Sequence, residues 1–330
     1  MSKLAVFNKW LEKIMPLLTP GSVAIGVLSS SWLQSYTFLA PWVFAFMTFA
    51  GSLGSGFREM FQVLMRPLPV LVNLVILHAL MPLVAWGLGS LFFPDDIHAV
   101  TGFILAMIIP TGVSSLLWTS IYMGNMALTL SIIVIDTLLS PLLVPLGISL
   151  LLGTAVEMEM GEMVRGMFFM IVLPSLAAMT LNHVTRGRVK QTVAPALAPF
   201  SKLSMGVIVA INSSVVAPYL TQVDEKLVKT AALVFVLATC GFVVGWLVGR
   251  LFRWKRDVIV TLAFNSGMRN IGAGSVLAIA YFPPAVALPV VLGMLFQQSL
   301  AALFGQFLRV VEKEEQTAPV QAVEKRNMNM

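Results

Sequence analysis

Residues 265–274 read Asn-Ser-Gly-Met-Arg-Asn-Ile-Gly-Ala-Gly, a polar and glycine-rich stretch inside an otherwise apolar segment. A second apolar segment is interrupted in the same way at residues 109–115, which read Ile-Pro-Thr-Gly-Val-Ser-Ser. Proline and glycine break helices, and a broken helix leaves backbone N–H and C=O groups that hydrocarbon cannot satisfy. Inside a membrane, such breaks are therefore expected to line a cavity or a ligand site.

The composition places the whole chain in a membrane. Of its 330 residues, 58% are hydrophobic and 11% are charged, whereas soluble domains carry about 25% charged residues. Apolar segments of about 20 residues predict transmembrane helices, and we predict an all-α polytopic membrane protein with residues 1–310 as a single transmembrane domain. The ten predicted spans are residues 14–34, 38–57, 68–93, 99–122, 126–153, 163–182, 200–220, 229–249, 258–280 and 284–308. Residues 311–330 have too little apolar content to fold and are predicted to be a disordered cytoplasmic tail.

The positions of the two breaks indicate an internal repeat. One break falls in the fourth span and the other in the ninth, which is the fourth span of each half of five. Interrupted helices at corresponding positions of two halves are typical of transporters built from inverted repeats. We therefore predict two inverted five-helix repeats whose broken helices 4 and 9 cross at the bilayer midplane.

The charges between the spans predict the topology. Most of the 21 basic residues fall in joints on one side of the predicted spans, including residues 186–190 and 250–256. The other side carries mainly acidic residues, at positions 95, 96, 157, 159, 162, 224 and 225. The positive-inside rule then places both termini in the cytoplasm, for a multi-pass protein of the cell inner membrane. Topology accounts for the net charge of +6 without a nucleic-acid partner, and one cysteine with three histidines predicts neither a disulfide framework nor a metal cluster.

Two charged residues, Asp136 and Arg269, lie inside predicted spans. Each is about ten residues from its span's start, so at 1.5 Å per residue both lie roughly 15 Å deep, near the midplane. A charge at that depth costs at least about 2.5–3.5 kcal/mol, which favours pairing of the two. One interpretation is an ion pair that only fixes helix packing. The other is a substrate or proton site, and His78 in the third span is a weaker candidate for the same role.

The broken helices also present positive helix ends, which attract anions. We therefore predict that the half-helix starts bind a small organic anion, with Arg269 as a permanent counter-charge and Asp136 as its balance when the site is empty. The predicted substrate-binding residues are Gly112, Val113, Ser114, Ser115, Asn265, Ser266, Arg269 and Asn270.

Three motifs give the chain a family resemblance. Residues 124–129 read Gly-Asn-Met-Ala-Leu-Thr, residues 140–145 read Ser-Pro-Leu-Leu-Val-Pro, and residues 267–270 read Gly-Met-Arg-Asn. Together with the two breaks, they make residues 14–308 resemble the bile acid:sodium symporter family in its bacterial ten-helix form. The resemblance implies a core of spans 3, 4, 5, 8, 9 and 10 that moves against a panel of spans 1, 2, 6 and 7. It also implies an organic anion bound beside the crossing.

The sodium ligands of that family are mostly replaced here. Where the family has a glutamate and a glutamine in the ninth span, this chain has Asn265 and Arg269. Other family ligands fall on Leu77, Leu116 and Ile133, which have no side-chain oxygen. Only Ser115, Thr129 and backbone carbonyls remain as possible ion ligands. We therefore predict no metal site, no cofactor and no dependence on sodium.

The function predicted from these observations is secondary-active transport of a small organic anion by alternating access, either proton-coupled through Asp136 or uncoupled. The predicted coupling residues are Asp136, Arg269, Ser115, Thr129 and, more weakly, His78. The rival within transport is a sodium symporter with relocated ligands. The rivals outside it are a passive channel and a membrane-embedded enzyme using His78, Asp136 and a serine, and we do not expect an enzyme. The expected partners are the anion and the lipid bilayer, in a monomer or a homodimer.

Overall fold

The structure, a computed structural model, describes residues 3–57, 67–153, 159–221 and 223–328, without the side chains of residues 3–6, 9, 12, 13, 15, 16 and 312–328. Arg58, Arg66 and Glu157, which belong to the predicted charge pattern, lie outside the described residues. The described chain is helical, and its one strand-like pairing is an isolated antiparallel bridge. The helices are α1 (Lys3–Leu28), α2 (Ser30–Leu33), η1 (Gln34–Leu39), α3 (Ala40–Ser52), α5 (Pro67–Val75), η3 (Ile76–Leu80), α6 (Met81–Phe92), α7 (Ile97–Ile108), α8 (Ser115–Ile121), α9 (Met126–Leu152), α10 (Met160–Met167), η5 (Phe168–Val172), α11 (Leu173–Val184), α12 (Arg188–Val215), α13 (Ala217–Leu220), α14 (Glu225–Leu251), α15 (Arg256–Gly267), α16 (Ile271–Tyr281) and α17 (Pro284–Met328).

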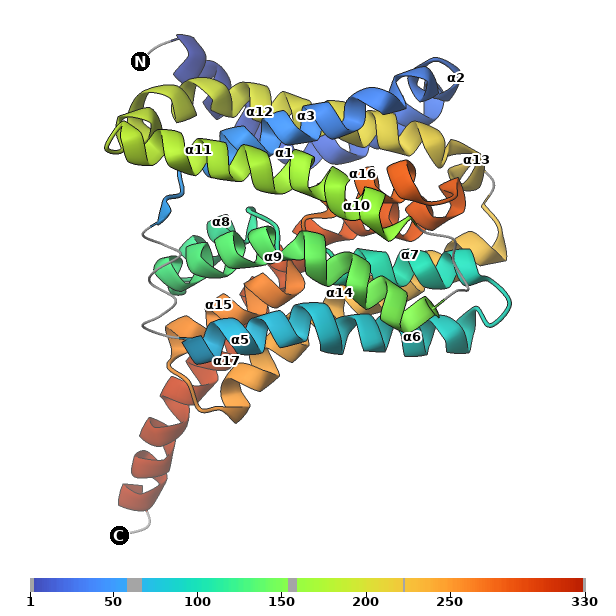
Figure 1. Ribbon diagram of the computed structural model, residues 1–330. Helices are drawn as coiled ribbons and strands as arrows, with labels where there is room; N and C mark the ends of the chain where they lie inside the picture. The colour runs from blue at the N-terminus through green and yellow to red at the C-terminus, as the bar shows by residue number, and fades with distance from the viewer. Residues whose placement is uncertain (1–2, 58–66, 154–158, 222, 329–330) are drawn as a thin grey trace.

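The helices form two layers, which Figure 1 shows one above the other. One layer contains α1, α3, α11 and α12, and the other contains α5 to α9, α14, α15 and α17. Helix α16 lies where the layers meet, with α3 and α12 on one side and α7 and α17 on the other. The main apolar core surrounds α7, whose residues from Ala99 to Ile108 are all buried. A helix buried on all sides has no polar face, which explains the unbroken apolar run in its sequence.

Both predicted helix breaks are present. Helix α7 ends at Ile108 and α8 begins at Ser115, while α15 ends at Gly267 and α16 begins at Ile271. Asn270 is the N-cap of α16, and its side chain accepts a hydrogen bond from the backbone N–H of Ala273. A side-chain oxygen at the N-cap satisfies a donor that the helix leaves free, so the second half-helix can start inside the protein.

Two long helices are widened by a π-helical turn before a proline. The turn η3 precedes Pro82 in α6, and η5 precedes Pro174 in α11. Proline has no N–H and its ring clashes with the carbonyl four residues earlier, so a wider turn relieves the clash. In η3 that carbonyl belongs to His78, one of the residues singled out from the sequence.

Within the described residues, six helical segments are long and apolar enough to cross a membrane, and they are Pro67–Phe92, Met126–Leu152, Met160–Val184, Arg188–Val215, Glu225–Leu251 and Pro284–Val311. The halves of the broken spans are too short to qualify, and two of them, Ile97–Ile108 and Ile271–Tyr281, are short apolar helices. The chain is therefore an all-α polytopic membrane protein, as predicted. The count of ten spans and the inverted repeat stay predictions. Helix α17 continues to Met328, through most of the segment predicted to be a disordered tail.

Candidate functional site

The two breaks meet in the structure and pair with each other. Thr111 and Arg269 form the antiparallel bridge between the two extended segments. The N–H of Gly112 donates to the carbonyl of Met268 at 2.9 Å, and the N–H of Asn270 donates to the carbonyl of Pro110 at 2.8 Å. These two bonds satisfy some of the backbone groups that the breaks free, which hydrocarbon surroundings cannot do.

Gly112 allows this close approach. A Cβ atom at residue 112 would lie 2.8 Å from the carbonyl oxygen of Arg269, closer than real Cβ contacts. Only glycine fits without moving one of the two segments. Three consecutive residues of the fourth span therefore build this contact: Pro110 breaks the helix, Thr111 forms the bridge and Gly112 allows the close approach.

A buried polar cluster lies beside the crossing and includes three residues predicted from the sequence. Ser115 Oγ donates to Asn265 Oδ1 at 3.2 Å, and Asn265 Nδ2 donates to Thr129 Oγ1 at 3.3 Å and to the carbonyl of Thr261 at 2.8 Å. Thr111 Oγ1 donates to the carbonyls of Asn265 and Met268. The four side chains that make these bonds are all buried. Asn265 Nδ2 therefore directs an N–H donor toward Thr129, where a cation would need oxygen atoms.

Asp136 is fully buried and both of its carboxylate oxygens are used. Oδ1 lies 2.5 Å from His78 Nε2, and Oδ2 accepts a hydrogen bond from the backbone N–H of Thr111 at 2.6 Å. The expected pairing of Asp136 with Arg269 is wrong, because no ion pair joins them, although both residues are described. Equal depth in the membrane did not imply contact: Asp136 faces the break of the fourth span and the π-helical turn that carries His78.

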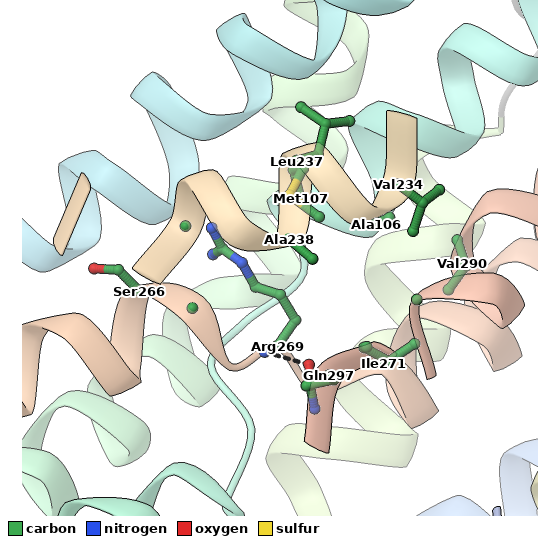
Figure 2. Close-up of a pocket in the computed structure, with 13 residues that line it drawn as sticks. Ala106, Met107, Val234, Leu237, Ala238, Ser266, Arg269, Ile271, Val290 and Gln297 are labelled. Atoms are coloured by element: carbon green, nitrogen blue, oxygen red, sulfur yellow. Dashed lines mark hydrogen bonds between the residues drawn. The ribbon is translucent and has the colours of Figure 1, made fainter. Parts of the chain in front are cut away.

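Arg269 is 3% exposed and its guanidinium points away from the crossing. Its backbone N–H donates to Gln297 Oε1 at 2.9 Å, and Figure 2 shows the side chain extending from there toward the side where Ser266 and Ala238 lie. Nη1 and Nη2 are buried and have no hydrogen-bond partner among the described residues. The guanidinium lines a pocket of about 10 Å³ between α7, α14, α15, α16 and α17, which has room for about one water molecule.

The other predicted substrate residues divide between two environments. Val113 is exposed, and Ser114 and Asn270 are half-buried. Gly112 is buried in the crossing, and Ser266 is buried on the opposite side, where its Oγ donates to Asn73 Oδ1 at 2.9 Å. The structure therefore does not gather all of the predicted residues around one cavity. Three of them are exposed or half-buried, and the rest are buried inside the bundle.

Sequence reasoning missed two residues that hold the crossing. Asn73 lies in an apolar helix five residues before His78, and that polar position was a usable signal. Thr111 was part of the quoted break, but nothing in the sequence indicated that its N–H would bind Asp136. Gln297 is a polar residue in the tenth predicted span. It contacts the second break because α17, which carries Gln297, packs on α16.

Comparisons with known proteins agree with this architecture. Residues 41–223 match the sequence profile of the Sodium Bile acid symporter family. The "Uncharacterized protein YbaS" of Bacillus subtilis (strain 168) is 49% identical over 298 residues, which cover 90% of this chain and 97% of that protein.

Two further relatives have names that describe transport. The "Uncharacterized sodium-dependent transporter YocS" of the same organism is 27% identical over 264 residues, 78% of each chain. The "Probable sodium/metabolite cotransporter BASS3, chloroplastic" of Oryza sativa subsp. japonica is 24% identical over 260 residues, 74% of this chain and 58% of that protein. The chain therefore belongs to the Sodium Bile acid symporter family, and it is a multi-pass membrane transporter rather than an enzyme.

Proposed function

We propose that this transporter carries a small organic anion across the cell inner membrane by alternating access and does not require sodium. The observation that carries the proposal is the buried guanidinium of Arg269, whose Nη atoms have no partner among the described residues. A buried cation without hydrogen-bond partners is costly. The low local dielectric constant around it strengthens its attraction to a nearby anion.

The anion binds at the accessible face of the crossing, beside Val113, Ser114 and Asn270. The pocket at the guanidinium, at about 10 Å³, is too small for an organic anion. Arg269 therefore acts through its charge from inside the bundle, and the free N–H groups at the start of α16 contact the anion. Asn270 fixes that helix start and stands next to Arg269 in the chain.

The arrangement in two layers supports alternating access. We assign the layer of α1, α3, α11 and α12 as the panel, and α5 to α9 with α14 to α17 as the core. The core moves against the panel and carries the crossing with it. A hydrogen bond between the layers marks the surface that slides: Asn212 Nδ2 of α12 donates to Ser275 Oγ of α16 at 2.5 Å.

Independence from sodium is supported by the polar cluster. Its oxygen atoms are already joined by hydrogen bonds, and Asn265 directs N–H donors into it. Hard cations such as sodium prefer several oxygen ligands, and the side chain of Asn265 supplies only one oxygen atom. The alternative is sodium symport through other ligands, which the names of the two more distant relatives favour.

The topology with both termini in the cytoplasm is supported by two acidic loops that meet at one end of the bundle. Asp96 and Lys226 form an ion pair of 2.6 Å beside an open pocket of about 490 Å³ that Asp95 and Glu225 also line. Burial opposes ionisation of Asp96, but hydrogen bonds from Lys226 and the Ala99 N–H, with the charge of Lys226, hold its pKa below the usual value. This end is the outer one in our proposal.

Cysteine labelling tests that topology in intact cells, using a background in which Cys240 is replaced. Cysteines at positions 95 and 225 should react with a membrane-impermeant reagent, and a cysteine at position 188 should not. Labelling of position 188 from outside contradicts the proposed orientation.

Uptake into proteoliposomes tests the function. The panel contains gluconate, lactate, succinate, benzenesulfonate and cholate, each radiolabelled and each measured with a sodium gradient and with choline in its place. We expect saturable uptake of at least one anion, a change below twofold without sodium, and loss of uptake in Arg269→Gln. Arg165→Gln, which removes an exposed arginine in the last turn of α10, is the control. Strong saturable stimulation by sodium would select the alternative.

A further inference from the structure

One ring nitrogen of His78 is buried and has no hydrogen-bond partner in the part of the chain that the structure describes. The 2.5 Å contact between His78 Nε2 and Asp136 Oδ1 requires a proton between them. We take the tautomer in which Nε2 carries this proton, so that the Asp136 carboxylate accepts on both oxygens, from His78 and from the N–H of Thr111. His78 Nδ1 is then an acceptor that has no partner among the described residues. It is the place where one more proton would bind.

The charges around the crossing balance only in certain loading states. With Asp136 ionised, Arg269 charged and His78 neutral, the sum is zero. An anion at the crossing changes the sum to minus one, and a proton on His78 Nδ1 returns it to zero. A proton without an anion gives plus one. Net charge inside hydrocarbon is strongly disfavoured, so the empty state and the doubly loaded state are the two that can move.

We propose that the transporter is a proton–anion symporter in which His78 binds the coupled proton on Nδ1, with one proton moved for each monovalent anion. This inference rests on the proposed transport of organic anions. A proton from the outer aqueous phase binds Nδ1, moves with the anion and leaves from the same atom on the other side. No covalent bond changes, and Asp136 stays ionised throughout.

Other titratable groups do not compete for this role. Among the elements packed against η3, which are α5, α6, α7 and α9, the titratable side chains are Asp136 and His98, and His98 is exposed in the first turn of α7. Two helices packed against α9 carry other charged residues, all in a terminal turn or at the N-cap. Helix α10 has Glu159, Glu162 and Arg165, and α15 has Arg256 and Asp257 at its start. Arg269 is the charge that acts on Asp136 from the second break.

The same contacts connect the proton to the crossing. Asp136 joins His78 directly to the backbone of Thr111, which is a bridge residue of the two broken helices. A charge on His78 strengthens its bond with Asp136 and weakens the acceptor that Thr111 uses. Pro82 leaves the turn around His78 widened, and turns of this kind recur at functional sites because they rearrange locally.

Transport with a pH-sensitive dye tests the coupling. Proteoliposomes contain pyranine, valinomycin with potassium clamps the membrane potential, and the probe is the monovalent panel anion with the largest uptake above protein-free liposomes. We expect the anion to acidify the lumen and the KM for the anion to rise with pH, by up to about tenfold per pH unit, because one proton binds with each anion. His78→Gln keeps a donor for Asp136 and should remove both effects, whereas His98→Gln should behave as the wild type does.

A second measurement needs no transported anion. Purified protein is unfolded thermally at pH 8 and pH 5, in wild type, Arg269→Gln, His78→Gln and the double variant. Without Arg269, a proton on His78 completes a neutral pair, so acidification should stabilise Arg269→Gln relative to wild type. This difference should vanish when His78→Gln is present in both.

The outcomes separate the two proposals. If no panel anion is taken up but the stability difference appears, the choice of organic anions is wrong and the proton site stands. If uptake depends on Arg269 but His78→Gln keeps both the acidification and the pH dependence of KM, the proton site is refuted and the transport proposal stands. Equal pH effects on the stability of wild type and Arg269→Gln also refute the charge balance.

Discussion

Replacement of Asp136 by alanine tests whether its carboxylate holds the crossing together. The change leaves two buried donors, the N–H of Thr111 and the ring N–H of His78, without acceptors, and it leaves Arg269 as an uncompensated charge. An unsatisfied buried donor costs about 1–3 kcal/mol, so the two donors together should cost about 2–6 kcal/mol. At roughly 2 °C per kcal/mol for a chain of this size, the midpoint of thermal unfolding in detergent should fall by about 4–12 °C.

Ser140→Ala is the matched control for this experiment. Ser140 lies one turn further along α9, is also fully buried, and donates to the carbonyl of Thr137 within its own helix. Its loss should cost about 1 kcal/mol. In Asp136→Ala/His78→Ala the losses should be less than additive, because the two side chains share one contact. Equal losses in Asp136→Ala and Ser140→Ala would refute the reasoning.

Three further perturbations address the crossing, the contact between the layers and the coupling ion. Gly112→Ala places a Cβ atom 2.8 Å from the carbonyl oxygen of Arg269, so we expect a loss of about 1–3 kcal/mol and uptake below a tenth of wild type; normal uptake would contradict the close approach. Asn212→Ala removes the 2.5 Å hydrogen bond to Ser275 Oγ. Because Asn212 Oδ1 has no partner among the described residues, its removal costs nothing further, and stability should fall by about 1 kcal/mol or less. The uptake rate should nevertheless change several-fold. Replacing sodium by choline should leave anion-induced thermal stabilisation unchanged, which a binding titration monitored by unfolding temperature measures.

The sequence predicted the features that depend on local chemistry. Pro110 and the glycines of residues 267–274 break helices wherever they occur, so the breaks could be located without a structure. The two charges in apolar segments were equally visible. Family membership followed from short motifs around those breaks.

The sequence could not predict which side chains meet. Asp136 and Arg269 lie at similar depth, but a helix residue points in one direction only, and Asp136 points to His78 and Thr111. Arg269 belongs to an extended segment, where no helical periodicity indicates the direction of its side chain. Its backbone meets Gln297 while its guanidinium lies on another side, and such an arrangement depends on tertiary packing.

The separation of the two charges bears on their purpose. If they served only helix packing, direct contact between Asp136 and Arg269 would neutralise both with the fewest buried polar atoms. Instead Asp136 uses both oxygens to hold His78 and the first break, and the guanidinium of Arg269 in the second break has no hydrogen-bond partner among the described residues. A fold keeps an unsatisfied buried cation at a cost in stability, and such strain is typical of sites where a ligand completes the set of contacts. We therefore assign the two breaks different roles in the proposed mechanism: the carboxylate at the first break holds the proposed proton acceptor, and the guanidinium of the second break supplies the positive charge for the proposed anion.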